Sequence, residues 1–197
     1  MTSEPFAATA AAPHAVSPLR PTYLLAAAAA FAVMGVAIAG DSLWFLNFVH
    51  VIAGSLWTGI DLFMGFVIGP VLRRVPLETR RAMIVGIVPR TLVLMPTLSI
   101  ITSTSGWFLA QRMGFLDLGY PQFWWMIAAL AIVTLLTIQG MGYLLPMNLM
   151  LYFETQKPVP DVDKLGRRMR SYVRVVGLQG TMQVAIYVVM TKITIGF

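Results

Sequence analysis

The chain contains no cysteine and only two histidines among its 197 residues. The lack of cysteine excludes a disulfide framework, thiolate metal sites, iron–sulfur clusters and c-type haem attachment. Two histidines are also too few for an all-histidine metal cage within one chain. These absences leave only a few ways in which the protein could hold a metal.

Charge is scarce as well, since Asp, Glu, Lys and Arg make up 11% of the chain and apolar residues 58%. Soluble domains hold about a quarter of charged residues, and the mean hydropathy here is +0.78. This composition argues against a soluble globular domain. The net charge of +6 does not indicate nucleic acid, because the basic residues lie between apolar runs, where they report membrane orientation.

Five apolar segments approach or exceed the roughly 20 residues that a membrane-spanning helix needs. They cover residues 23–39, 43–71, 82–109, 123–151 and 172–195. The sequence therefore predicts an all-α integral membrane helix bundle, with four core transmembrane helices plus an N-terminal fifth. Residues 23–197 would form a single membrane domain in the lipid bilayer. Residues 1–22, rich in alanine and proline, would form a disordered cytoplasmic tail.

The first apolar segment has two interpretations. It is short and mostly alanine, and it ends in Ala37-Ile38-Ala39, which is typical of a signal-peptidase site. It is therefore either a cleaved signal or a retained helix. We favour a retained helix, because about 20 residues precede its apolar core and a whole signal peptide has about 15–30.

Basic residues gather in two of the four connections. They are Arg73, Arg74, Arg80 and Arg81 after the second segment, and Lys157, Lys164, Arg167, Arg168 and Arg170 after the fourth. By the positive-inside rule both connections are cytoplasmic. This predicts a multi-pass membrane protein with its N-terminus cytoplasmic and its C-terminus on the outer side. The outer ends of the segments carry the tryptophans of an aromatic belt, namely Trp44, Trp107, Trp124 and Trp125.

The second segment holds two polar side chains, His50 and Asp61, that are eleven residues apart. Three helical turns bring both onto one face, about 16 Å apart along the axis. Gly54 and Trp57 lie between them on the same stripe. A charge at mid-bilayer costs about 2.5–3.5 kcal/mol, so we expect this face to turn toward protein.

Depth suggests partners for Asp61. It lies about 15 Å from the inner end of its segment, and Arg90 of the third segment lies at about 12 Å. The amides Gln139, Gln179 and Gln183 reach similar depths. We therefore expect a buried polar cluster of these five residues, centred on an Asp61–Arg90 ion pair. It would either fix helix register or form a proton or substrate path, and pairing favours the structural role.

His50 lies in the outer half, at the depth of a run of hydroxyls at 102–105 and of Tyr187. It is either a hydrogen-bonded core residue or an axial ligand of b-type haem, and the residues alone leave both open. Gly54 would leave room for a flat macrocycle, although glycine also serves close helix packing. Three methionines, Met141, Met147 and Met150, would suit Cu(I), but methionine commonly fills apolar gaps, and we favour that role.

The stretch from Trp44 to Gly59, in which His50 is followed seven residues later by Trp57, resembles the first core helix of the copper-resistance D family and of the HemJ-type protoporphyrinogen oxidases. Pro96, followed by Thr-Ser-Thr-Ser-Gly at 102–106, is similar to a second helix of this group. The resemblance implies a small polytopic protein of the bacterial inner membrane, whose C-terminus would then be periplasmic, and assigns b-type haem to His50.

We therefore expect haem b to bind through His50, beside Gly54 and Trp57, in a pocket between the second, third and fifth segments. It would serve electron transfer or porphyrin oxidation, with a membrane redox partner or a second copy of the chain. Catalytic residues are not assigned, and whether the protein is an enzyme stays open. The alternative is a non-catalytic membrane subunit or a copper-handling transporter without haem.

Overall fold

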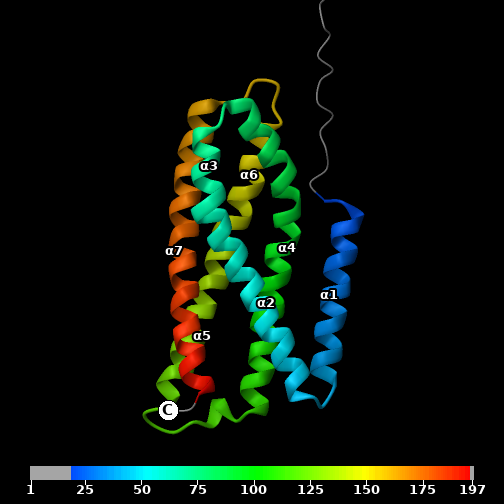
Figure 1. The fold of residues 1–197 in the computed structure, drawn as a ribbon, viewed down its shortest axis with the longest axis vertical. Coiled ribbons are helices and arrows are strands. Elements are labelled where there is room, and N and C mark those ends of the chain that lie inside the picture. The colour runs from blue at the N-terminus through cyan, green and yellow to red at the C-terminus, as the bar shows by residue number, and fades with distance from the viewer. Residues whose placement is uncertain (1–18, 196–197) are drawn as a thin grey trace, which may run out of the picture.

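The computed structural model describes residues 19–195, with every side chain except that of Leu77. Of the tail expected at residues 1–22, the part up to residue 18 lies outside this range, and the last two residues, Pro21 and Thr22, already belong to the first helix. Within it the chain is helical and contains no strand. The elements in chain order (Figure 1) are α1 (Pro21–Ala39), α2 (Leu43–Phe63), η1 (Met64–Ile68), α3 (Gly69–Arg74), α4 (Leu77–Arg112), η2 (Phe115–Asp117), α5 (Phe123–Gln139), η3 (Gly140–Leu144), α6 (Leu145–Thr155) and α7 (Val162–Thr194).

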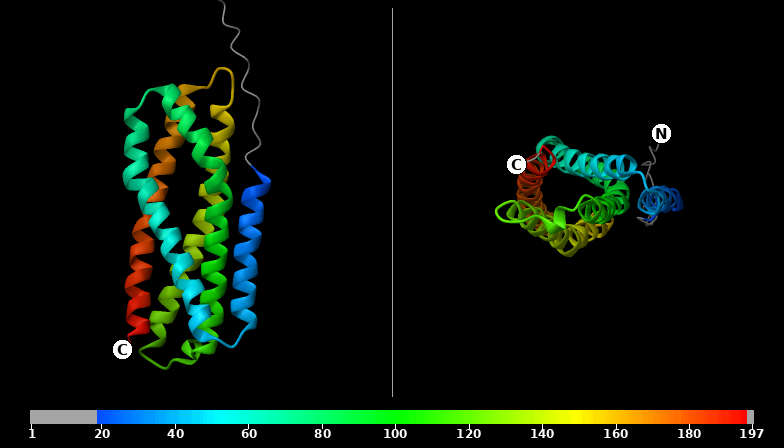
Figure 2. Two further views of the ribbon diagram at one scale, coloured as in Figure 1. Left: turned by 45° about the vertical axis from the view of Figure 1, so that its right-hand side comes forward. Right: turned by 90° about the horizontal axis from the view of Figure 1, so that it is seen from below.

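These elements form five segments that are long and apolar enough to cross a membrane. They cover Pro21–Ala39, Leu43–Arg74, Glu78–Arg112, Phe123–Thr155 and Val162–Thr194. The predicted all-α membrane bundle is therefore confirmed. Seen along its long axis (Figure 2), the last four segments form a ring and α1 stands outside it.

Helix α1 packs on the outside of α2 and α4. Its Ala37, only 1% exposed, belongs to the same apolar cluster as Leu46 of α2. At the same end of α1, Arg112 of α4 donates to the carbonyl oxygens of Gly40, at 2.7 Å, and Ile38. In this structure the first segment is thus a helix that packs against the four-helix ring, as the additional N-terminal helix of the bundle.

Both basic connections lie at one end of the bundle, and the C-terminal end of α7 lies at the other (Figure 1). Helix α7 begins at Val162, ten residues before the predicted start of the fifth segment. The apolar run did not predict this start, because a capping side chain, and not hydropathy, determines where the helix begins. The Asp161 side chain accepts a hydrogen bond from the Lys164 backbone N–H at 2.9 Å, and this bond holds the pKa of Asp161 below its ordinary value.

Of the five prolines in the segments, Pro21 begins α1 and two others lie next to π-helical turns. Pro70 follows η1 and Pro146 follows η3, whereas Pro89 and Pro96 lie inside the continuous helix α4. Proline has no N–H and its ring crowds the preceding turn, and a π-helical turn is one way to relieve this. Gly140 of η3 forms part of the wall of the cavity described below.

Candidate functional site

Asp61 is buried in the middle of the second segment and is the centre of a polar cluster. Its Oδ2 accepts hydrogen bonds from Gln179 Nε2 at 2.6 Å and from Gln183 Nε2 at 2.9 Å. Trp57, one turn earlier on α2, also hydrogen-bonds the carboxyl group. The two glutamines are four residues apart and so share one face of α7. A carboxylate on α2 is thereby joined to two amides on α7, as the depth argument predicted.

The predicted Asp61–Arg90 ion pair is wrong. Arg90 is exposed, donates to the Gly86 carbonyl of its own helix, and lies over the ring of Tyr23 on α1, 5.8 Å from the centroid. The depth of Arg90 matched that of Asp61, but depth does not say which way a side chain points around its helix. Helix α4 turns Arg90 toward α1, and the next residue, Thr91, faces the cavity beside Asp61.

Gln139 is also separate from the carboxylate. Its Nε2 donates to the Val175 backbone carbonyl at 2.8 Å. This bond links the C-terminal end of α5 to α7, one turn before Gln179. The predicted cluster is therefore reduced to Asp61 with two of its three expected amides, and Gln139 is a neighbouring helix-to-helix contact.

A cavity of about 40 Å³ lies beside Asp61. Its polar lining comes from α2, α4, α6 and α7, namely Asp61, Thr91, Ser99, Asn148, Tyr172 and Gln179. Tyr172 hydrogen-bonds to Asn148. A buried water needs about 10–15 Å³ of such space, so the cavity has room for a few waters. It has no room for a macrocycle.

Sequence reasoning missed most of this lining. One signal was present: Thr91 and Ser99 are eight residues apart, with Met95 between them, so all three lie on one stripe of α4. Asn148 and Tyr172 carry no such signal, because they come from different segments and meet only when α6 packs on α7.

His50 is held against α4. Its Nδ1 lies 2.9 Å from the Thr102 backbone carbonyl oxygen, which can only accept, so Nδ1 carries the proton. Ser105 Oγ lies 3.4 Å from the same nitrogen. The imidazole ring packs directly against Gly106, where a side chain would not fit. A Cβ built on Gly106 would lie only 2.7 Å from His50 Cε1. Among residues 19–195, none hydrogen-bonds to Nε2.

The room expected beside Gly54 is filled. A Cβ built on Gly54 would lie 3.3 Å from Thr102 Cγ2, so this glycine allows α2 and α4 to pack closely. Trp57 is only 4% exposed and contributes to the apolar core and to the Asp61 cluster. Tyr187 donates to Ser55 Oγ at 3.0 Å, not to His50. The expected lining of a haem pocket by Gly54 and Trp57 is thus corrected: both residues hold the bundle together.

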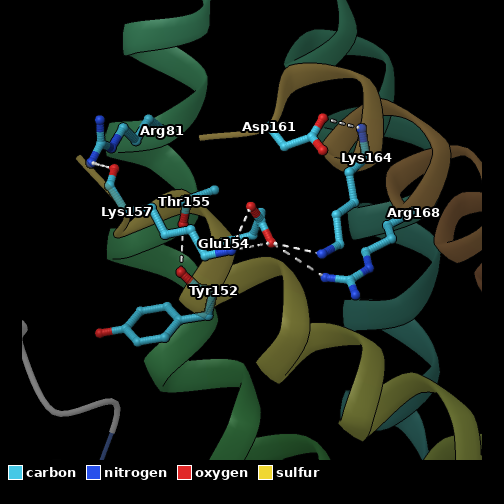
Figure 3. Close-up of polar contacts among 8 residues, drawn as sticks. All are labelled: Arg81, Tyr152, Glu154, Thr155, Lys157, Asp161, Lys164 and Arg168. Atoms are coloured by element: carbon cyan, nitrogen blue, oxygen red, sulfur yellow. Dashed lines mark hydrogen bonds and ion pairs between the residues drawn. The ribbon is translucent and has the colours of Figure 1, made fainter. Parts of the chain in front are cut away.

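At the end of the bundle that carries the basic connections, Glu154 is a second buried carboxylate, 4% exposed. Lys157 Nζ lies 2.9 Å from Oε1, and Lys164 Nζ and Arg168 Nη1 lie 3.7 Å from Oε2 (Figure 3). Arg81 of α4 donates to the Lys157 carbonyl at 2.8 Å. This cluster ties the ends of α4, α6 and α7 together and has a structural role.

Comparison of the chain with protein-family models, with curated proteins and with solved structures gave no match. The resemblance of the second and third segments to the copper-resistance D and HemJ-type proteins therefore stays a prediction. Within residues 19–195, no three or more His, Cys, Asp and Glu side chains gather where they could hold a metal ion. A haem or metal at His50 would have this side chain as its principal protein ligand.

Proposed function

We propose that this chain is a multi-pass protein of the bacterial inner membrane that binds b-type haem through Nε2 of His50. Electron transfer or porphyrin oxidation is its proposed activity. One observation carries the proposal: the His50 Nδ1–H donates to the Thr102 carbonyl at 2.9 Å. Histidines that bind metals usually donate their other ring N–H to a carbonyl or carboxylate, which fixes the tautomer and leaves a lone pair for the metal.

The surroundings of His50 suit a fixed ligand. The ring lies in the notch at Gly106, with Ser105 beside it, so its orientation is set before any ligand binds. When bound, haem supplies one-electron chemistry, and the chain contributes the oriented imidazole in an apolar bundle. Gly54 and Trp57 act indirectly in this proposal, by holding α2 against its neighbours.

The second candidate is a non-catalytic membrane subunit or a copper-handling transporter without haem. The observation in its favour is the contact at Gly54, where Thr102 fills the space that a macrocycle would use. A copper ion needs far less room than a haem. The same Nε2 lone pair would bind it.

The test is the absorption spectrum of the detergent-purified protein, oxidised and dithionite-reduced, with a pyridine haemochrome assay. We expect a b-type spectrum near one haem per chain, and we expect His50→Ala to abolish it. Ser55→Ala is the matched control, because it alters a neighbouring polar contact of α2 and leaves the imidazole in place. A spectrum that persists in His50→Ala, or that is absent after expression with haem supplied, would contradict the proposal. Copper bound in its place would support the second candidate.

The topology is part of the same proposal. Both basic connections face the cytoplasm, and the C-terminus faces the periplasm. Support comes from the position of these connections at one end of the bundle and from the exposed tryptophans at the other, among them Trp44 at 73% exposure. The proposed partner for electron exchange is a membrane redox protein or a second copy of this chain.

A further inference from the structure

The carboxylate of Asp61 lacks a basic partner in the part of the chain that the structure describes. The ion pairs found there are all made by Glu154. Asp61 is 7% exposed and receives hydrogen bonds from Gln179, Gln183 and Trp57. An ionised carboxyl group at this position would therefore be surrounded by hydrogen-bond donors, but no basic side chain of residues 19–195 pairs with it to balance its charge.

A second and independent observation concerns the two glutamines. Each turns its N–H₂ group to Asp61, and this leaves the Oε1 atoms of both buried without a hydrogen-bond partner among residues 19–195. Gln179 is only 2% exposed. Its Oε1 lies 3.9 Å from a Cβ built on Gly140, and both residues line the cavity. A buried acceptor without a partner is costly, so this carbonyl oxygen marks a place where a donor or a cation is missing.

The lining of the cavity narrows the chemistry of that group. Besides Asp61 and Gln179 it includes two hydroxyls, an amide and a phenol, from Thr91, Ser99, Asn148 and Tyr172. The rest of the lining is apolar, so these oxygen atoms are the ligands that the cavity offers, and oxygen ligands suit hard cations. A single carboxylate balances one positive charge, and the space of about 40 Å³ admits a small ion with a few waters.

We propose that the cavity beside Asp61 binds a sodium ion, with the Asp61 carboxylate and the Gln179 carbonyl oxygen as its principal ligands. The ion neutralises the buried charge and supplies the missing partner of the Gln179 carbonyl. Hydroxyls of the cavity and trapped waters complete its coordination. This site is separate from His50 and does not depend on the haem proposal.

The experiment follows thermal unfolding of the full chain in detergent while sodium chloride replaces choline chloride at constant ionic strength. We expect the Tm to rise by about 3–5 °C for each tenfold increase in sodium above its Kd. Asp61→Asn should remove this dependence. Gln139→Met is the matched control, because it deletes a partly buried amide contact to α7 outside the cavity and should keep the dependence.

Three results would overturn the proposal. The first is a Tm of the wild-type chain that is the same in sodium and choline. The second is full sodium dependence of the Tm in Asp61→Asn. The third is a Tm that rises when the pH is lowered but not when sodium is added. The last result would mark a proton site, since Asp61 and Tyr172 are the titratable side chains of the cavity. Equilibrium binding of radioactive sodium to the wild-type chain is the second measurement. Saturable binding, weakened at least tenfold in Gln179→Met, supports the site, and its absence overturns it even where Asp61→Asn does not fold.

Discussion

Replacing Gly106 with alanine tests whether helix packing fixes the imidazole of His50. The new Cβ would lie 2.7 Å from His50 Cε1 and 3.0 Å from Nδ1. Favourable carbon–carbon contacts are at about 3.5–4.0 Å, so the ring must retreat by about 1 Å. The hydrogen bond from Nδ1 to the Thr102 carbonyl, now 2.9 Å, then exceeds the normal range of about 2.7–3.2 Å.

The expected loss of stability follows from three terms. Inserting a methyl group into a packed interface costs about 1–3 kcal/mol, and the weakened hydrogen bond costs about 1 kcal/mol more. Alanine offsets about 1 kcal/mol through its better helix propensity. The free energy of unfolding should therefore fall by about 2 kcal/mol, which for a chain of this size lowers the Tm by about 4–8 °C.

The control is Gly59→Ala on α2, because a Cβ built at Gly59 meets nothing within 4 Å. It gains the same helix propensity without a clash, so its Tm should not fall. Both variants are measured by near-UV circular dichroism in one detergent. Equal Tm values for Gly106→Ala and Gly59→Ala would refute the reasoning. In the haem-loaded protein, Gly106→Ala should also shift the Soret band, whereas Gly59→Ala should not.

Three further predictions concern other parts of the bundle. Glu154→Gln removes the carboxylate that holds three basic side chains and should lower the Tm, although only modestly because its partners are partly exposed. The exposed Asp163→Asn should change little, and equal losses in these two variants would argue against the cluster. The hydrogen bond from the Lys164 amide to the Asp161 carboxylate lowers the pKa of Asp161 in the folded protein. It should therefore be intact above the ordinary Asp pKa of about 3.9. It should be lost only as the pH falls through the lower pKa that Asp161 has in the folded protein. The NMR shift of the Lys164 amide checks this, and a midpoint at or above the ordinary value contradicts it. Because the chain has no cysteine, Tyr120→Cys and Val159→Cys, at positions 81% and 86% exposed, test topology directly. A membrane-impermeant maleimide should label the former in intact spheroplasts and the latter only after lysis, and the reverse pattern would invert the proposed orientation.

The fold class could be predicted because it depends on local properties of the chain. The hydropathy and length of each apolar run can be read from the run itself. Inside a bilayer, a single segment can satisfy its backbone hydrogen bonds only by forming a helix. The start of α7 was misjudged by ten residues because Asp161 caps the helix in a polar stretch, where hydropathy carries no signal. The sequence did contain a signal for this start, namely Asp161, a residue type that commonly caps the first turn of a helix.

The polar sites were only half predictable. Position along a helix gives depth, which correctly placed Asp61 near Gln179 and Gln183. Depth says nothing about rotation around the helix axis, so Arg90 was paired with Asp61 although α4 turns it toward α1. Rotation is set by how all the helices pack together.

The sequence by itself thus determined the five apolar helices, their alternating direction and the level of each polar side chain. Only the tertiary structure decided which side chains face one another. The partner of His50 shows the reason most clearly: it is the backbone carbonyl of Thr102, a group that every residue carries. The cavity beside Asp61 likewise exists only where four segments meet, because its walls are contributed by residues far apart in the chain.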